Sequence, residues 1–385
     1  MAATKRWALN GGPFGSKLST KHYSDSGVPV IRGTNLSGGT RFSFEDFVWV
    51  SEETADELLP NNAHPGDLIF TQRGTIGQVG LIPVDSSFKR FVISQSQMKL
   101  TPDKSQTDAL FLYYYFSDAE TVSKIKNLAF AAGVPHINLE ILRNFEVIVP
   151  PLADQRRIAG ILAAYDELIE NSQRRIRILE SMARALYREW FVHFRFPGHE
   201  KQSRVSSPLG EIPEGWDVKK LGDVLELNYG KALKKEDRRE GQFCVYGSSG
   251  VIGMHDRSLV RGPGIIVGRK GNVGSVFWCD DDFFVIDTAY FVTSSLPLRF
   301  LFYVLPSLNF INSDAAVPGL SRNQAYTLEV LVPPSPLLRK FCDLADSLER
   351  QSQVLQRQIN NLRRTRDLLL PRLLSGQVEL ETEAA

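Results

Sequence analysis

Cysteines and long apolar runs are both scarce in this chain, and each shortage argues against a class of protein. The 385 residues include three cysteines, Cys244, Cys279 and Cys342, which fall in no CxxC or Cys/His spacing. That argues against a zinc site and a disulfide framework and fits a reducing compartment. No run of about 18 apolar residues is present to span a bilayer, and Met1–Trp7 lacks the apolar core of a signal peptide. We therefore expect a cytoplasmic protein without a metal ion.

Neither sign of charge is in excess, and the common catalytic motifs are missing. The formal net charge is +1, and residues 1–150 hold 14 Lys and Arg against 15 Asp and Glu. Any binding of nucleic acid must therefore come from local patches. No Walker loop, HExxH or GxSxG motif occurs. The Asp/Asn-Pro-Pro-aromatic tetrapeptide of an adenine methyltransferase is absent too, because Val149–Leu152 and Val332–Ser335 lack its acid or amide and its aromatic residue. We predict a non-enzymatic protein with no cofactor.

The chain does contain two heptad repeats. Between residues 152 and 190, mostly apolar positions recur in alternating steps of four and three, and the intervening positions are mostly charged or polar. This spacing predicts one long helix with a coiled-coil seam. The seam residues are Ile158, Leu162, Tyr165, Ile169, Ser172, Ile176, Leu179, Ala183, Leu186 and Trp190.

A second seam follows 183 residues later, so the chain carries its own partner helix. It consists of Phe341, Ala345, Leu348, Ser352, Leu355, Ile359, Leu362, Arg366, Leu369 and Leu373. Arg366 stands where the first helix has Ala183. It either specifies the register of the pair or extends its charged end to solvent near the helix end, and we favour the second interpretation. Pro371 is expected to break or kink the helix just beyond it.

Globular segments surround the first predicted helix. Short β-branched and aromatic runs alternate with Gly, Pro, Asn and Ser clusters, and two helical stretches, Glu52–Leu59 and Asp108–Asn127, interrupt the first segment. The expected class is therefore α+β, with two mostly β domains. The predicted strands are Val28–Arg32, Phe47–Val50, Asp67–Thr71, Gln78–Ile82, Phe91–Ile93, Glu146–Val149, Phe243–Tyr246, Gly264–Val267, Ser275–Trp278 and Glu329–Val332.

The second half of the chain repeats the first, which indicates a tandem duplication. Gly66–Gly77 aligns with Gly262–Gly274, and Ala131–Glu140 aligns with Ala315–Gln324, placing Val134–Pro135 on Val317–Pro318. Val147–Pro151 aligns with Val330–Pro334 at the same 183-residue offset as the seams.

In combination, several motifs resemble the specificity (S) subunits of type I restriction–modification systems over nearly the whole chain. They are Gly12–Leu18 with Val28–Leu36, Pro150–Leu162, Glu180–Gly198, Gly210–Trp216 and Thr365–Gly376. The resemblance implies two target-recognition domains, each reading one half of a split double-stranded DNA sequence. The resemblance also implies that two antiparallel helices hold these domains apart and dock two methyltransferase (modification) subunits, and that restriction/translocase subunits join through the complex. An S subunit of this family has no catalysis of its own.

These observations lead to a predicted domain map. One departure from the repeat is that Gly210–Leu227 has no full counterpart before Trp7, and the tail Gly376–Leu380 is a candidate to fill the gap. The map is 1–150 for target-recognition domain 1, 151–196 for helix 1, 197–210 for a linker, 211–334 for target-recognition domain 2, 335–374 for helix 2 and 375–385 for a tail.

The best candidates for DNA contact are two glycine loops at matched positions in the repeat. Gln72, Arg73, Gly74 and Thr75 correspond to Arg269, Lys270, Gly271 and Asn272, so a basic residue beside a flexible backbone occurs in both copies. Such groups suit phosphates or base edges. A hairpin turn with solvated charge is the alternative interpretation.

Weaker candidates come from other polar loops. Thr34 and Asn35 after Arg32, and Ser248 and Ser249 after Gly247, either read bases or are turn residues. Gln95, after the basic pair Lys89 and Arg90, offers an amide to an adenine edge or belongs to a polar strand face. His136, which replaces Gly319 of the other copy, and Arg322 complete the predicted DNA-contact set.

The alternative function is that of a scaffold for other proteins. A duplicated coiled-coil scaffold that binds only protein would keep both seams, but it would not need basic glycine loops at matched positions. The aromatic clusters Phe111–Phe116 and Trp190–Phe196 are expected in the core, and the second of them is the better candidate for docking a partner.

Overall fold

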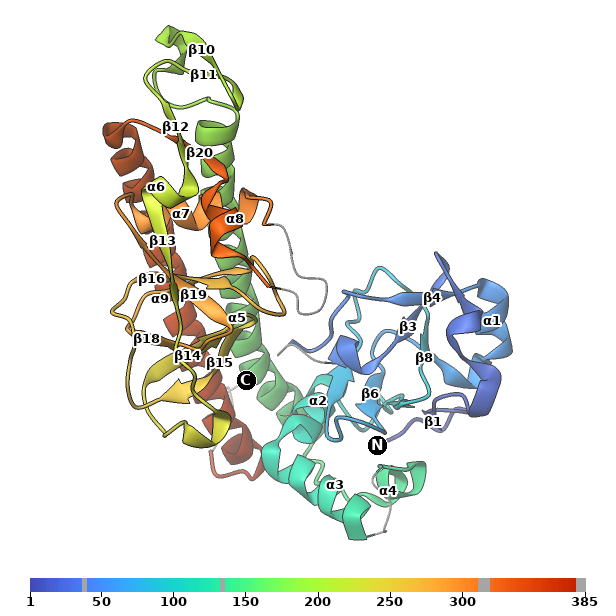
Figure 1. The fold of residues 1–385 in the computed structure, drawn as a ribbon. Helices are drawn as coiled ribbons and strands as arrows, with labels where there is room; N and C mark the ends of the chain where they lie inside the picture. The colour runs from blue at the N-terminus through green and yellow to red at the C-terminus, as the bar shows by residue number, and fades with distance from the viewer. Residues whose placement is uncertain (37–39, 132–135, 311–318, 379–385) are drawn as a thin grey trace, which may run out of the picture. The chain divides into compact units, whose positions relative to one another are not determined.

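Two units of mixed α and β structure make up the computed structural model of the chain (Figure 1). The structure describes residues 1–36, 40–131, 136–310 and 319–378. One unit comprises Met1–Arg174 and Gln356–Ala385, and the other comprises Arg175–Leu355. The long helices α5 (Leu152–Tyr187) and α9 (Ser335–Leu374) each contribute one part to each unit.

The first unit contains two sheets. The first sheet is antiparallel, and the second contains one parallel pair, β3 with β8. The first has the order β1 (Leu9–Gly11), β9 (Gln97–Leu100), β6 (Leu68–Thr71), β7 (Val79–Leu81); the second has the order β2 (Tyr23–Ser24), β4 (Val48–Val50), β3 (Val28–Ile31), β8 (Phe91–Ile93), β5 (Asn62–Ala63). Its shorter helices are α1 (Glu52–Glu57), α2 (Ala109–Ser117), α3 (Ala119–Ala131) and α4 (Leu139–Asn144).

The second unit repeats this plan. Its four-stranded sheet is antiparallel, and its three-stranded sheet pairs β14 with β18 in parallel. The orders are β13 (Leu225–Tyr229), β19 (Ala289–Ser294), β16 (Gly264–Gly268), β17 (Val276–Cys279) and β15 (Gly250–His255), β14 (Phe243–Gly247), β18 (Phe283–Val285). The shorter helices are α6 (Leu221–Val224), α7 (Leu298–Val304) and α8 (Arg322–Tyr326). The tandem duplication predicted from sequence is therefore visible in strand order.

Each unit buries its four-stranded sheet against helices. In the first unit the core joins Leu68 and Met98 to Phe111 of α2 and to Leu162 of α5. In the second, the corresponding core joins Ile265 and Tyr290 to Phe300 of α7 and Phe341 of α9. The sheet and the long helices thus share one core within each unit, as in other layered α and β folds.

The predicted helix Asp108–Asn127 is interrupted at Asp118. That residue has an extended backbone, and its carboxylate accepts a hydrogen bond from the Thr121 amide at 3.0 Å. Asp118 therefore ends α2 and caps the start of α3, because a carboxylate at this position satisfies a free N–H of the first turn. The aromatic face of α2 still lies in the core, with Phe111 and Phe116 each 1% exposed.

The strand predicted at Glu146–Val149 is wrong. These residues form no strand, and Ile148 and Val149 are exposed. In the second unit the matching strand β20 (Glu329–Val332) pairs with β12 (Asp217–Lys220). No segment in the described part of the first unit pairs with Glu146–Val149, and a strand without a partner leaves its backbone groups unpaired.

Other predicted segments differ in part from the structure or lie in part outside the described residues. The stretch 197–210, predicted as a linker, contains β10 (Arg204–Ser207), which forms a hairpin with β11 (Gly210–Pro213). The tail Gly376–Leu380, suggested as a substitute partner, forms no strand as far as Val378, and its last two residues lie outside the described part. The alignment of Val134–Pro135 with Val317–Pro318 also lies outside the described residues.

Both long helices bury their predicted seams. Every seam position is buried or half-buried, including Ile158, Leu162, Tyr165, Ile169, Ile176, Leu179 and Leu186 of α5 and Leu348, Leu355, Ile359, Leu362 and Leu369 of α9. Pro371 does not end α9, which continues to Leu374. None of the helices in the described ranges is both long and apolar enough to cross a membrane.

Candidate nucleic-acid interface

The first glycine loop, Gln72–Thr75, connects β6 to β7 at one end of the four-stranded sheet. The backbone amides of Gln72 and Arg73 both donate to the Ser96 carbonyl, at 2.7 and 3.4 Å. The Gln72 carbonyl accepts from the Ile137 amide at 3.1 Å. The loop backbone is therefore held on both sides by distant segments.

The second loop, Arg269–Asn272, connects β16 to β17 and uses the same scheme of hydrogen bonds. The amides of Arg269 and Lys270 donate to the Thr288 carbonyl at 2.9 and 3.0 Å, and the Arg269 carbonyl accepts from the Leu320 amide at 2.8 Å. The structure thus pairs the two loops residue by residue, in the alignment predicted from sequence.

Each loop turns at a glycine in the left-handed region, Gly74 at φ +92° and Gly271 at φ +78°. An L side chain rarely adopts this conformation, so glycine is favoured at both turns. The basic residue before each glycine is solvent-accessible, with Arg73 exposed and Lys270 half-buried, and Thr75 and Asn272 are exposed beside them. Both loops therefore present a positive charge on a constrained backbone.

The polar turns after β3 and β14 both expose a hydroxyl side chain. Thr34 and Ser249 are exposed. The Ser248 carbonyl accepts a hydrogen bond from the Ser275 hydroxyl at 2.5 Å, so this turn lies against the second glycine loop. Thr34, Ser248 and Ser249 consequently remain candidates for DNA contact.

Asn35 does not fit its predicted role in DNA contact. Its side chain is fully buried; Oδ1 accepts from the Arg32 amide at 2.8 Å, and Nδ2 donates to the Ser43 and Glu45 carbonyls. An amide whose donors and acceptor are engaged inside the fold has nothing left for a base edge. Here the alternative interpretation, a turn residue, agrees with the structure.

Three further candidates are held by contacts within the protein. The Arg90 guanidinium bridges Glu52 and Asp56 of α1, which raises its pKa. The Gln95 amide donates to the Gly15 and Leu18 carbonyls at 2.6 and 2.7 Å. The Arg32 guanidinium donates to the Asp46 carbonyl. These bonds give the three side chains structural roles, which the prediction of DNA contact did not anticipate. Lys89 is exposed and His136 is half-buried.

A cluster that the sequence did not reveal surrounds Tyr229 at the end of β13. The guanidinium carbons of Arg269 and Arg322 each lie 4.8 Å from the centroid of the Tyr229 ring, and that ring lies 5.1 Å from the ring of Tyr290. Burial raises the pKa of Tyr290 to about 12. Tyr229 itself is 49% exposed. Its two arginines were predicted individually, but no spacing in the sequence links them to an aromatic residue about 40 and 90 positions away.

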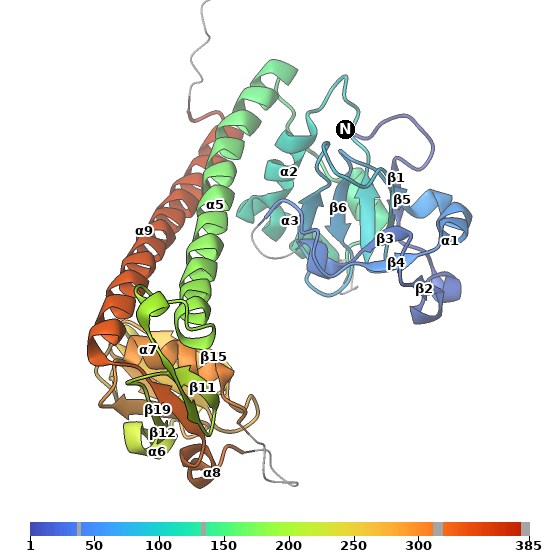
Figure 2. The ribbon, with the colours of Figure 1, turned by 90° about the horizontal axis from the view of Figure 1, so that it is seen from above.

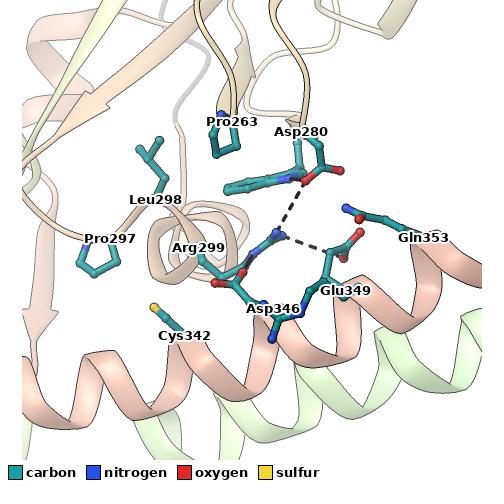
Figure 3. Close-up of a pocket in the computed structure, with 11 residues that line it drawn as sticks. Pro263, Asp280, Pro297, Leu298, Arg299, Cys342, Asp346, Glu349 and Gln353 are labelled. Atoms are coloured by element: carbon teal, nitrogen blue, oxygen red, sulfur yellow. Dashed lines mark hydrogen bonds and ion pairs between the residues drawn. The ribbon is translucent and has the colours of Figure 1, made fainter.

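Arg299 of α7 fixes the sheet of the second unit to α9 (Figure 3). Its side chain is 7% exposed, its guanidinium stacks on the Trp278 ring at 3.7 Å, and Nε donates to Asp346 at 2.7 Å. Glu349 and Asp280 each lie 3.9 Å from this guanidinium. A pocket of about 520 Å³ opens beside these groups. Because the arginine charge is neutralised locally, this cluster is better suited to holding the domain than to binding DNA.

Asp166 of α5 has the corresponding place in the first unit, 183 residues before Glu349. It accepts hydrogen bonds from the Tyr114 hydroxyl of α2 at 2.6 Å and from Arg366 of α9. Helix α9 runs beside α5 (Figure 2). The prediction that Arg366 extends to solvent is wrong, because its side chain is 23% exposed and is paired with a carboxylate that is 8% exposed. An ion pair at a seam position can specify register, which is the other interpretation offered above.

The aromatic cluster Trp190–Phe196 is part of the core of the second unit. Trp190, Phe191 and Phe196 are 6%, 5% and 7% exposed, and the Phe191 ring contacts Phe341 of α9 at 4.9 Å between centroids. These three rings are therefore unavailable for docking a partner, in agreement with the expected core role.

Residues 14–181 and 213–361 each match the family model described as the type I restriction modification DNA specificity domain. Each match covers one globular segment and much of the helix that follows it. The chain belongs to this family.

Two relatives illustrate how much of the chain the similarity covers. The type I restriction enzyme MjaIX specificity subunit of Methanocaldococcus jannaschii is 26% identical over 410 aligned positions, covering 95% of this chain and 91% of the relative. The HindI specificity subunit of Haemophilus influenzae is 21% identical over 404 positions, covering 81% and 86%. The crystal structure of the S subunit of a type I restriction–modification system from M. genitalium covers 96% of this chain and 95% of its own, with 20% identity and a TM-score of 0.57, which supports the fold.

Proposed function

We propose that this chain is the DNA-recognition subunit of a type I restriction–modification complex and that each half reads one half of a bipartite target. The observation that carries the proposal is the pair of glycine loops. Both have the same backbone hydrogen bonds and a basic residue at the same place, while the side chains around them differ. A common scaffold with variable side chains suits two sites that bind one polymer but read different bases.

We assign target recognition to residues 1–150 and 211–334, and spacing to the helices. The helices also dock two methyltransferase subunits, through which restriction subunits join, and catalysis belongs to those partners. At about 1.5 Å per residue, the 36 residues of α5 extend roughly 54 Å, enough to separate half-sites by about one turn of duplex. The alternative, a scaffold that binds only protein, does not account for two matched basic loops.

Methylation mapping tests the proposal. DNA from cells that express the chain should carry methyl groups at a split sequence, and DNA from cells lacking it should not. Replacing residues 1–149 with the matching segment of a relative should change one half of that sequence and leave the other half intact. A change in both halves, or in neither, would refute the assignment of one half to each domain.

A second assay separates recognition from catalysis. The purified chain alone should transfer no methyl group to DNA, and activity should appear only when methyltransferase subunits are added. Turnover by the isolated chain above background would contradict the assignment of catalysis to partners. Binding that is insensitive to salt would instead favour the protein scaffold, because phosphate contacts release counterions.

A further inference from the structure

Two arginines of the second unit share one exposed tyrosine. Arg269 opens the second glycine loop, Arg322 is the first residue of α8, and both guanidiniums lie 4.8 Å from the centroid of the Tyr229 ring. The two guanidinium carbons are therefore separated by at most twice that distance. Cation–π contact orients each guanidinium but does not neutralise its charge.

Neither arginine has a carboxylate partner among the residues that the structure describes. This separates them from Arg90, Arg299 and Arg366, each of which forms an ion pair. Arg269 donates to the Asp287 carbonyl at 2.9 Å, and Arg322 donates to the Leu227 carbonyl at 3.4 Å. A guanidinium has five N–H groups, so most donors of both side chains are left for a ligand.

The first unit lacks every member of this cluster. In the strand pairing of the second unit Tyr229 lies opposite Tyr290, and in that of the first unit Gly11 lies opposite Met98. In both units the amide of the next residue, Gly230 or Gly12, donates to the matching carbonyl of the partner strand. Gly11 thus stands in place of Tyr229. Gln72 replaces Arg269, and Leu139, the first residue of α4, replaces Arg322. The repeat keeps the backbone here but removes both charges and the ring.

We propose that Tyr229, Arg269 and Arg322 form a clamp for one backbone phosphate of the DNA half-site read by the second unit. This inference rests on the proposed function. Two guanidiniums on one ring, with no carboxylate partner among the described residues, call for an anion, and their planar donors match phosphate oxygens. Lys231, Lys234 and Lys235, which follow Tyr229, are exposed and add positive charge. Tyr229 is a positioning residue that holds both arginines in place.

Salt-dependent binding tests the clamp. The full chain, in the complex in which it is purified, is titrated with a duplex containing the mapped target and with a scrambled duplex, at several salt concentrations. Arg269→Ala and Arg322→Ala should each weaken binding about tenfold or more, as expected for one charge-assisted hydrogen bond. Each should also lower the salt slope, by less than one unit because the other arginine still faces the phosphate. Because both arginines share one phosphate, the double variant should lower the slope by about one, not two.

Variants of the tyrosine separate positioning from folding. Tyr229→Phe keeps the ring and should bind like the wild type, whereas Tyr229→Leu should lose affinity while its thermal midpoint stays near that of Tyr229→Phe. The methylated sequence should be unchanged in all variants, since a phosphate contact carries no base information. Lys104→Ala, which removes one exposed charge from a turn of the first unit, is the control and should leave the slope unchanged.

The outcomes distinguish the possible failures. Equal wild-type affinity for target and scrambled duplexes would refute the proposed function itself. Specific wild-type binding with unchanged slopes in both arginine variants would overturn only the clamp. Relaxed preference at one base would assign the arginines to base reading instead. If millimolar inorganic phosphate bound the wild type but not the double variant, while both bound DNA with the same affinity, the site would bind free anions only and the clamp would be overturned.

Discussion

The Nη1 atom of Arg366 on α9 donates a hydrogen bond to Oδ1 of Asp166 on α5, across 200 residues of sequence. Asp166 also accepts from Tyr114 of α2, and Arg41 lies 3.9 Å away. One carboxylate therefore connects both long helices to the globular part of the first unit. In the second unit the matching position, Glu349, faces Arg299 of α7, so the repeat retains an acidic connection between domain and helix while changing its partners.

Removing Arg366 should destabilise the first unit. Arg366→Ala leaves the buried carboxylate of Asp166 without its strongest cation, and we expect a loss of about 2 kcal/mol in the free energy of unfolding. Urea denaturation of the full chain measures it. Arg364→Ala, an exposed arginine two residues earlier, is the control and should change stability by less than about 0.5 kcal/mol. Equal urea midpoints for the two variants would show that the ion pair contributes nothing to the stability of the fold.

The acidic residues around Arg299 should respond differently to neutralisation. Burial raises the pKa of Glu349, and Arg299 acts in the opposite direction without cancelling the shift. The folded protein thus binds the proton of the Glu349 carboxyl more tightly than the unfolded chain does. The resulting stabilisation of the fold is fully present below the unfolded pKa, and it is lost as pH rises through the folded pKa. Glu349→Gln should therefore raise the thermal midpoint at neutral pH and leave it unchanged below about pH 4.

Asp346→Asn is the matched comparison on the same face of α9. Its carboxylate accepts directly from Arg299 Nε, so neutralising it should lower stability by about 1 kcal/mol at neutral pH. Thermal melts of both variants across the pH range test these opposite expectations. Parallel shifts of the same sign would mean that the two carboxylates are not distinguished by burial.

The glycine loops should act through separate half-sites. In Arg73→Ala or Lys270→Ala, loss of a base contact costs about 1–3 kcal/mol and changes preference at one position, whereas loss of a phosphate contact weakens all sequences alike and lowers the salt slope by about one. Duplexes altered in one half at a time identify which half each residue serves. Lys104→Ala, an exposed lysine in a turn of the first unit, is the control. Wild-type affinity in both loop variants would remove the loops from the interface.

The helices should set the distance between half-sites. Ser172 and Leu355 are matched by the 183-residue offset, and inserting one heptad after each preserves the seam and adds about 10 Å. The unread gap should then widen by about three base pairs, at about 3.4 Å per pair, with both half-sequences retained. Rotation of the second half-site around the duplex is expected to reduce affinity or shift the preferred gap. An active variant that keeps the original gap would show that the helices do not determine spacing.

What the sequence determined by itself is the part of the structure that depends on local periodicity and on the repeat. The heptad spacing located both long helices and the residues they bury, from Ile158 to Leu373, because a helix places every third or fourth residue on one face. The alignment of Gly66–Gly77 with Gly262–Gly274 matched the two glycine loops correctly. In these segments a residue's environment follows from its near neighbours in the chain, so pattern alone was sufficient.

Tertiary structure decided the rest, because it depends on partners far away in sequence. Glu146–Val149 has the composition of a strand but no partner strand, unlike Glu329–Val332 beside Asp217–Lys220. Asn35 and Arg90 are polar residues in apparent loops whose hydrogen bonds are used inside the fold. Tyr229, Arg269 and Arg322 form a cluster only because β13, the β16–β17 loop and α8 converge. Composition specifies what a side chain can bind, and the packing of distant segments decides whether that capacity is already used.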